Sequence, residues 1–342
     1  MREVVMDIYQ PPRNGVILMS GLPELSASKR AMLDKYLRGA LPQQAKHTSG
    51  PTQGEPDNTA PLSSPNTRSS VVALQPSGSK PPFFFLHVHV EGGAFYCFTL
   101  ANVLGADQPF YILDPYRFDG LQIPPTPEAM AADYLQALRS VQPEGPYYLG
   151  GFCGGGLLAF EVAQQLRAQG QEVRLLVLIE PRAGPDFFRM IGSRLIGLFV
   201  NGLGFGLRLS QDKRFALFLY ARHFYRLVHY KFLRPSQDPA LRLSLIPTLE
   251  TLRRDWIGIF VWVFSQYLPH HYPGKLTYLW TRDEPGNRKV GKWGHVVKAE
   301  EVEIQFIPGT QWSCRHEYLH EMAQSLKLCL NKAQASSWKA EA

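Results

Sequence analysis

Short apolar runs alternate with amphipathic stretches along the sequence from about Lys80 onward. The runs with the length and residue types of buried strands are Phe83–Val90, Phe110–Leu113, the run that begins at Tyr147, and Val173–Ile179. The stretches with helical spacing of apolar positions are, approximately, Ala94–Val103, Pro127–Val141 and Gly155–Ala168. Strands that alternate with helices pair in parallel, and the helices cover both faces of the sheet. The pattern therefore predicts an α/β fold with a mostly parallel central sheet.

This alternation breaks off at Pro181 and resumes near Lys275. Residues 186–268 read as helical and are rich in Phe, Leu, Tyr and Arg. Two further strands, Lys275–Trp280 and Val302–Ile307, follow this stretch, and a last helix at about Arg315–Asn331 follows them. We therefore expect residues 186–268 to form a helical insertion over the sheet, which we call the lid.

The chain before the sheet has a different character. Residues 1–40 hold one convincing element, a short amphipathic helix at Ala27–Arg38. Residues 41–79 are mostly Pro, Ser, Gly, Thr, Gln and Asn, a composition that buries too little apolar surface to stay ordered. We expect a disordered linker there, a folded domain at residues 80–333 and a tail at residues 334–342.

Charge is concentrated in one part of the sequence. The 342 residues are 45% hydrophobic and carry a formal net charge of +7. The segment 186–256 alone has 12 Arg and Lys residues against five acidic ones. Such a surface suits an acidic protein or a phosphate-bearing group, and it is equally typical of a solvated helical face. No nucleic-acid-binding motif accompanies it.

Cysteine usage and hydropathy bear on where the protein works. The four cysteines show no C-x-x-C spacing, and the N-terminus lacks the apolar core of a signal peptide. The longest uncharged apolar stretches, near Leu195–Leu207 and Trp256–Leu268, are about 13 residues long, whereas a membrane-spanning helix needs roughly 20. These features predict a cytoplasmic protein with no transmembrane helix. They give no indication of a metal site.

A glycine-rich segment joins the strand that begins at Tyr147 to the following helix. Gly151, Cys153 and Gly155 form the pattern G-x-C-x-G, where G-x-S-x-G is usual in a nucleophile elbow. In that motif the glycines are needed because strand and helix pass too closely for side chains. We predict that Cys153 is a nucleophile at the apex. The alternative is a glycine-rich turn with a buried cysteine.

The elbow would supply part of the chemistry that acyl transfer needs. Because Cys153 lies where a helix begins, the helix dipole is expected to favour its thiolate. The backbone N–H of Gly154 is one predicted oxyanion donor. The second should come from the loop His89–Gly93, with Val90 the best candidate, although an ordinary tight turn would have the same sequence.

A nucleophile of this kind usually works with a histidine base and a carboxylate that orients it. Glu180 directly follows the strand Val173–Ile179, and Asp283 follows the strand Lys275–Trp280. Either could be the acid, and either could be a solvated carboxylate at a strand end. The histidine is expected in the loop Pro308–Arg315, which contains none.

The domain also resembles a known family in its short motifs. These are LQPSGSKPPFF at Leu74–Phe84, QPEGPY at Gln142–Tyr147, and Pro-Gly at 308–309. About 250 residues, from Ser79 to Leu330, resemble the thioesterase domains that release products from polyketide synthases and non-ribosomal peptide synthetases. The segment Leu25–Gly39 resembles sequence found beside carrier-protein domains in those assemblies.

The resemblance implies an α/β-hydrolase fold, a catalytic triad and a lid over an acyl chamber. It further implies an acyl thioester substrate on the phosphopantetheine arm of an acidic acyl carrier protein or peptidyl carrier domain, with no bound cofactor. Such a partner would suit the basic lid. Glu180 and Asp283 match the two positions at which the family places its acid, with Glu in place of Asp at the first.

At one position the sequence departs from the family. The family's histidine follows Pro-Gly by one residue, and here that position is Gln311. Glutamine has no proton equilibrium near neutral pH, so it cannot act as a general base, a role that contributes about 10²- to 10⁴-fold. Three other histidines could replace it: His316 and His320 on the last helix, and His89 at the start of the predicted oxyanion loop.

Three functions remain compatible with these residues. The first is a thioesterase or acyltransferase of secondary-metabolite biosynthesis that forms an acyl-enzyme on Cys153 and whose turnover Gln311 puts in doubt. The second is a catalytically impaired relative that binds a carrier protein or an acyl chain without turnover. The third is a hydrolase of free small esters.

Overall fold

The structure is a computed structural model that describes residues 71–87, 94–118, 121–181, 187–228, 247–265, 267, 270–283 and 302–338. All of them belong to the compact unit Thr59–Ala342. The helix expected at Ala27–Arg38 lies outside the described residues. No helix in the described part is both long and apolar enough to cross a membrane.

The described strands form a single seven-stranded sheet in the order β1-β3-β2-β4-β5-β6-β7. β1 pairs antiparallel with β3, and every other pairing is parallel. The predicted mostly parallel sheet is therefore confirmed. The strands are β1 (Val71–Gln75), β2 (Phe83–Leu86), β3 (Phe110–Leu113), β4 (Tyr147–Phe152), β5 (Val173–Ile179), β6 (Leu276–Thr281) and β7 (Val302–Ile307).

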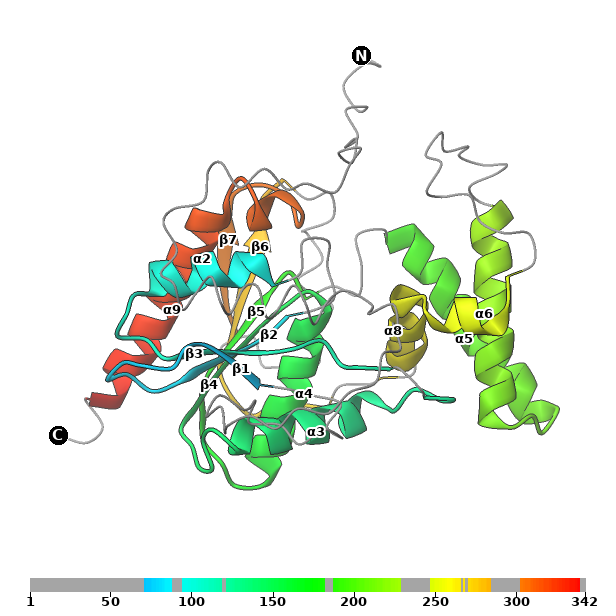
Figure 1. Ribbon diagram of the computed structural model, residues 1–342, viewed down its shortest axis with the longest axis horizontal. Coiled ribbons are helices and arrows are strands. Elements are labelled where there is room, and N and C mark those ends of the chain that lie inside the picture. The colour runs from blue at the N-terminus through cyan, green and yellow to red at the C-terminus, as the bar shows by residue number, and fades with distance from the viewer. Residues whose placement is uncertain are drawn as a thin grey trace, which may run out of the picture. The chain divides into compact units, whose positions relative to one another are not determined.

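Helices cover both faces of this sheet (Figure 1). α2 (Phe95–Leu104) contacts α9 (Leu319–Trp338) on one face. α3 (Pro127–Arg139) contacts α4 (Gly154–Ala168) on the other. Every residue of β4 and β6 is buried, as expected for central strands covered on both sides. The carboxyl ends of β4 and β5 thus lie side by side within a rigid, packed core.

The described part of the lid is helical. It consists of α5 (Phe187–Gly206), α6 (Gln211–Val228), α7 (Leu249–Arg253) and α8 (Trp256–Ser265), inserted between β5 and β6. α8 contacts each of the other three helices. Its Trp262 packs against Phe215 and Phe218 of α6, with ring centroids 5.6 and 5.1 Å away.

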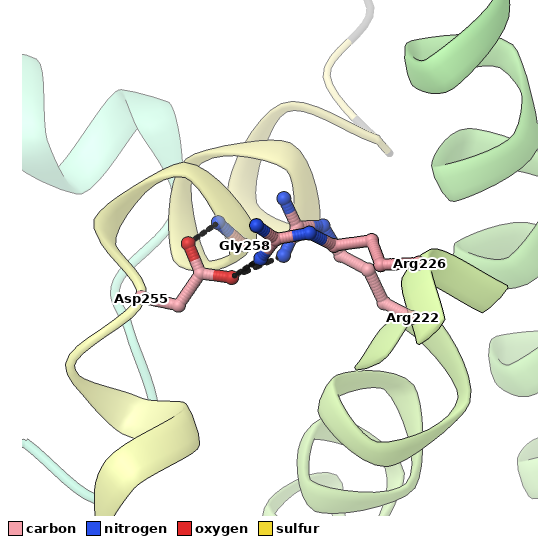
Figure 2. A network of polar contacts seen from close by, with 4 residues as sticks. All are labelled: Arg222, Arg226, Asp255 and Gly258. Carbon is pink, nitrogen blue, oxygen red and sulfur yellow. Dashed lines mark hydrogen bonds and ion pairs between the residues drawn. The ribbon is translucent and has the colours of Figure 1, made fainter. Parts of the chain in front are cut away.

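An ionic contact also joins α6 to α8 (Figure 2). Arg222 and Arg226 both donate to Asp255 Oδ2, the latter at 3.0 Å, while Gly258 N donates to Asp255 Oδ1 at 3.2 Å. Asp255 therefore caps α8 and pairs with two of the basic residues of the lid. Those two cations stabilise the lid itself.

Two boundaries expected from the sequence were wrong. The linker was expected to run to Ser79, but Val71–Gln75 is the edge strand β1, since its apolar residues pair with β3 and bury Leu74. The last helix was expected at Arg315–Asn331, but α9 is Leu319–Trp338. A 3-10 turn, η5 (Ser313–Arg315), precedes α9. α9 continues past residue 334, where the tail was expected to begin, because no Gly or Pro interrupts the helix there.

Candidate active site

The candidate site is centred on Cys153, between the end of β4 and the start of α4. Its backbone has φ 54° and ψ −122°, a conformation that costs a residue with a side chain on the order of 1–3 kcal/mol. Cys153 N donates to Ile179 O at 2.8 Å, and Gly156 N donates to Cys153 O at 3.1 Å. Both neighbouring elements thus hold the reversal in place, and the geometry is that of a nucleophile elbow.

The glycines around Cys153 are required by close backbone contacts. A Cβ atom on Gly151 would lie 2.5 Å from Gly155 O, and one on Gly155 would lie 2.2 Å from Leu86 O. A Cβ atom on Gly154 would lie 2.4 Å from Cζ of Phe260, which belongs to α8. Strand, helix and lid therefore meet at the elbow with no room for a further carbon.

Gln311 reaches Cys153 from the loop that follows β7. Its Nε2 donates a hydrogen bond to Cys153 Sγ at 3.0 Å. Gln311 is buried, and its backbone carbonyl oxygen accepts a hydrogen bond from Cys314 Sγ at 3.3 Å. The turn is closed by Thr310 N, which donates to Ser313 Oγ at 2.8 Å. The loop thus places an amide where the sequence pattern leads one to expect an imidazole.

Glu180 follows β5 directly and is completely buried. Its backbone also has a positive φ, 44°. Oε1 accepts from Thr281 N at 2.6 Å and from Thr281 Oγ1 at 2.7 Å, which fixes the carboxyl group at the end of β6. The charge of Glu180 acts on Cys153 and raises its pKa.

Asp283, the other carboxylate candidate, is exposed. Its Oδ2 accepts from Gly309 N at 3.1 Å, and its own N donates to Gly309 O at 3.1 Å. Gly309 has φ 83°, so this pair of bonds fixes a left-handed turn two residues before Gln311. The structure thus associates Glu180 with the thiol and Asp283 with the loop that carries Gln311.

The electrostatic state of Cys153 differs from the expectation. Burial raises the pKa of the Cys153 thiol to about 11, and the charge of Glu180 also raises it. The N–H of Gly154, the charge of Arg315 and the hydrogen bond from Gln311 lower the pKa but do not offset burial. The expected lowering of the pKa by the helix start was therefore wrong in its net direction. At neutral pH Cys153 is a thiol.

Arg315 was not identified from the sequence. It lies in η5, and only 8% of its surface is exposed. Its guanidinium carbon is 5.2 Å from the ring centroid of Phe152 and 5.9 Å from that of Tyr96. The available signal was an arginine in the same short loop as Gln311, but only tertiary contacts reveal its burial.

The remaining predicted residues fall into two groups. Val90 and His89 lie outside the described residues. Gly154 is described, and its backbone N–H forms a hydrogen bond to the Cys153 sulfur. Its role as an oxyanion donor stays a prediction. His316 is exposed and stacks on Trp312, with ring centroids 4.2 Å apart. His320 is exposed on α9, where its Nε2 lies 3.2 Å from Gln324 Nε2.

Among the described residues, no group of three or more His, Cys, Asp or Glu side chains could hold a metal ion. The groups brought together around the sulfur are a backbone amide, a side-chain amide, a guanidinium and a carboxyl group. These groups can stabilise charge on sulfur and on a carbonyl oxygen. Such a set suits acyl transfer.

Residues 82–186, which run from the start of β2 through the elbow and past the end of β5, match the family model described as "Thioesterase domain". The matched residues make up less than a third of this chain. The match stops where the lid begins. The matched segment therefore includes Cys153 and Glu180, whereas Asp283 and Gln311 lie beyond it.

Curated proteins with similar sequence include a synthase and several synthetases. The chain is 41% identical over 120 residues to a dimodular nonribosomal peptide synthase of Bacillus subtilis (strain 168), covering 34% of the chain and 5% of the relative. It is 39% identical over 115 residues to malpinin synthetase of Mortierella alpina, covering 33% and 2%. It is 37% identical over 117 residues to atromentin synthetase of Tapinella panuoides, and this match covers 34% of the chain and 12% of the relative. The chain thus spans a small part of each of these relatives.

The fold has solved counterparts. The crystal structure of holo-AB3403, a four-domain nonribosomal peptide synthetase bound to AMP and glycine, superposes with a TM-score of 0.50 and 22% identity. The match covers 75% of this chain and 20% of that one. At this identity the similarity concerns the fold, and the predicted α/β-hydrolase fold with its helical insertion is confirmed.

Proposed function

We propose that this protein accepts an acyl group from a thioester onto Cys153 and holds it as an acyl-enzyme. The observation that carries this proposal is the hydrogen bond from Gln311 Nε2 to the sulfur of a cysteine at the apex of a strained elbow. Strain of this kind persists where function requires the geometry. The Gly154 N–H, joined by a donor from the loop that contains Val90, would bind the oxyanion that forms during attack.

Acylation of Cys153 by a thioester needs little general-base catalysis. Cys153 Sγ attacks the thioester carbonyl, the bond to the leaving sulfur breaks, and the proton of Cys153 passes to that sulfur. One thioester and one thiol are consumed, and one of each is formed, so the step has no net proton demand. Because a thiol ionises far more readily than a hydroxyl, loss of the histidine harms acylation less than it would in a serine enzyme.

Release of the acyl group is the demanding step. Water must lose a proton as it attacks the Cys153 thioester, and the Gln311 amide cannot accept one. The missing general base slows this step by about 10²- to 10⁴-fold. The acyl-enzyme should therefore accumulate, with slow turnover to a free acid, a lactone or an amide according to the nucleophile that enters.

The substrate is proposed to be an acyl or peptidyl chain of nonribosomal peptide or polyketide biosynthesis in the cytoplasm. Its carrier would be an acyl carrier protein or peptidyl carrier domain with a phosphopantetheine arm, and the protein itself would bind no cofactor. The similarity to the dimodular nonribosomal peptide synthase of Bacillus subtilis (strain 168) supports this assignment. Phe260, in the buried aromatic ladder Trp256–Phe260–Phe264 of α8, packs against Gly154, so the elbow lies against an apolar part of the lid.

A second candidate function is supported by two observations at the same site. The Cys153 pKa of about 11 leaves little thiolate at neutral pH, and an amide occupies the position of the base. A protein of this kind could bind the carrier or its acyl chain without turnover. In that case Cys153→Ala would leave its biological function unchanged.

Incubation of the full chain with an acyl-pantetheine, followed by intact-mass spectrometry, separates the two candidates. The proposal predicts a mass increase of one acyl group on the wild type and none on Cys153→Ala. Peptide mapping should place the acyl group on Cys153. A protein that stays unmodified and releases no thiol would refute the acyl-enzyme and favour the binding function.

A further inference from the structure

Arg315 is a buried cation beside the candidate nucleophile. We propose that its guanidinium is the positive charge that stabilises the Cys153 thiolate, at a site where Gln311 stands in place of the expected histidine. This inference deepens the proposed function, since it rests on Cys153 as the nucleophile. It assigns to Arg315 the electrostatic part of a histidine's role and leaves the proton-accepting part unfilled.

Arg315 is buried, and no carboxylate of the described residues pairs with it. Arg315 is 8% exposed, and within the described ranges no Asp or Glu oxygen lies within ion-pair distance of it. A charge removed from water is costly unless an anion compensates it. The anion that the proposed reaction creates nearby is the sulfur of Cys153, and the charge of Arg315 lowers the pKa of that thiol.

Two aromatic rings hold the Arg315 guanidinium in place. It lies over the ring of Phe152, the residue that directly precedes Cys153, and over the ring of Tyr96 from α2. The electron-rich faces of these rings attract the cation without neutralising it. Arg315 N donates to Trp312 O at 3.2 Å, so the guanidinium belongs to the same short turn as Gln311. A single loop thus delivers a charge and an amide to one sulfur.

Among the residues that the structure describes, the other groups around the sulfur do not supply this charge. Glu180 contributes a charge that opposes a thiolate. Tyr96 and Cys97 of α2 both have raised pKa values because of burial and are neutral at physiological pH. α8, which covers the elbow, has no charged residue between Trp256 and Ser265. His87, at the end of β2, pairs with Asp114 Oδ1 at 3.5 Å.

The test is the rate of Cys153 alkylation by iodoacetamide between pH 7 and 9, measured on the full chain, with Cys153→Ala as background. Removing the charge in Arg315→Met should raise the thiol pKa by about 1–3 units. The thiolate then becomes scarcer but more nucleophilic, so the rate should fall about 3- to 30-fold at every pH in this range. Arg315→Lys keeps the positive charge, so its alkylation rate should fall less than that of Arg315→Met.

Arg174→Met is the matched control. Arg174 lies near the start of β5, at the far end of that strand from Glu180, and pairs with Glu172 at 2.9 Å, so its removal should leave the rate unchanged. An unfolded Arg315 variant would expose the sulfur and speed alkylation, which is the opposite sign. A rate equal to or above that of the wild type in an Arg315→Met variant whose circular dichroism shows it folded would overturn the inference. A loss in Arg315→Lys as large as in Arg315→Met would also overturn it.

The result does not depend on acyl transfer. A slower Arg315→Met in a protein that never becomes acylated would support the inference and refute the proposed function. An unchanged rate in a protein whose Cys153 does become acylated would refute only the inference.

Discussion

The side-chain amide of Gln311 donates a 3.0 Å hydrogen bond to the sulfur of Cys153. Residue 311 therefore reaches the apex of the elbow although it follows β7 and the cysteine follows β4. The loop geometry that would serve a histidine base is thus present, and the group it presents holds the sulfur as a donor.

The reactivity of Cys153 should rise steeply with pH. Because its pKa is raised to about 11, the thiol form dominates at neutral pH and the thiolate fraction grows about tenfold with each pH unit up to pH 10. The initial rate of acylation by an acyl-pantetheine, measured by mass spectrometry from pH 7 to 9.5, should follow this slope. A plateau below pH 9 would show that the sulfur ionises near the ordinary cysteine pKa.

Glu180 and Asp283 should contribute unequally to thioester turnover once residue 311 is a histidine. In a Gln311→His background, Glu180→Gln should remove most of the gained turnover, since Glu180 is the buried carboxylate that acts on Cys153. Asp283→Asn should remove less, because Asp283 holds Gly309 and acts on residue 311 only through the loop. Thioester turnover in the two double variants decides between them, and a larger loss with Asp283→Asn would reverse the assignment.

The elbow glycines should not tolerate a methyl group. In Gly155→Ala the new Cβ would lie 2.2 Å from Leu86 O, so the strand and helix must separate, and overpacking of this kind costs about 1–3 kcal/mol. Gly202→Ala in α5 is the control, since its Cβ would meet nothing within 4 Å and should slightly stabilise the helix. Denaturant unfolding compares the two, and equal midpoints would contradict the tight crossing.

The ionic contact of the lid should contribute measurably to stability. Asp255→Asn leaves Arg222 and Arg226 without their shared carboxylate, and loss of hydrogen bonds to a charged group costs about 1.5–3 kcal/mol. Glu250→Gln is the control, because Glu250 forms an exposed pair with Arg254 worth well under 1 kcal/mol. Thermal melts of both variants measure the difference, and matching melting temperatures would show that the Asp255 contact is dispensable.

Much of the fold could be predicted because its signals are local. The runs Val173–Ile179 and Val302–Ile307 coincide with β5 and β7, and the glycines around Cys153 mark a crossing that only glycine permits. β1 was missed because five residues in polar surroundings become a strand only by pairing with β3.

The electrostatics of the site could not be predicted in the same way. The helix start favours a thiolate at Cys153, but the opposing desolvation depends on tertiary packing around the elbow, where Gln311 contacts the sulfur and Phe260 packs against Gly154. The same applies to Arg315. Its position beside Phe152 and Tyr96 joins three distant parts of the chain, which no local pattern records.

The most direct measurement is thioester turnover by Gln311→His, compared with the wild type under identical conditions. If the rest of the site is competent for acyl transfer and only a proton acceptor is missing, turnover should rise by about two orders of magnitude and the acyl-enzyme should no longer accumulate. Turnover that stays at the wild-type level in a folded variant would contradict this.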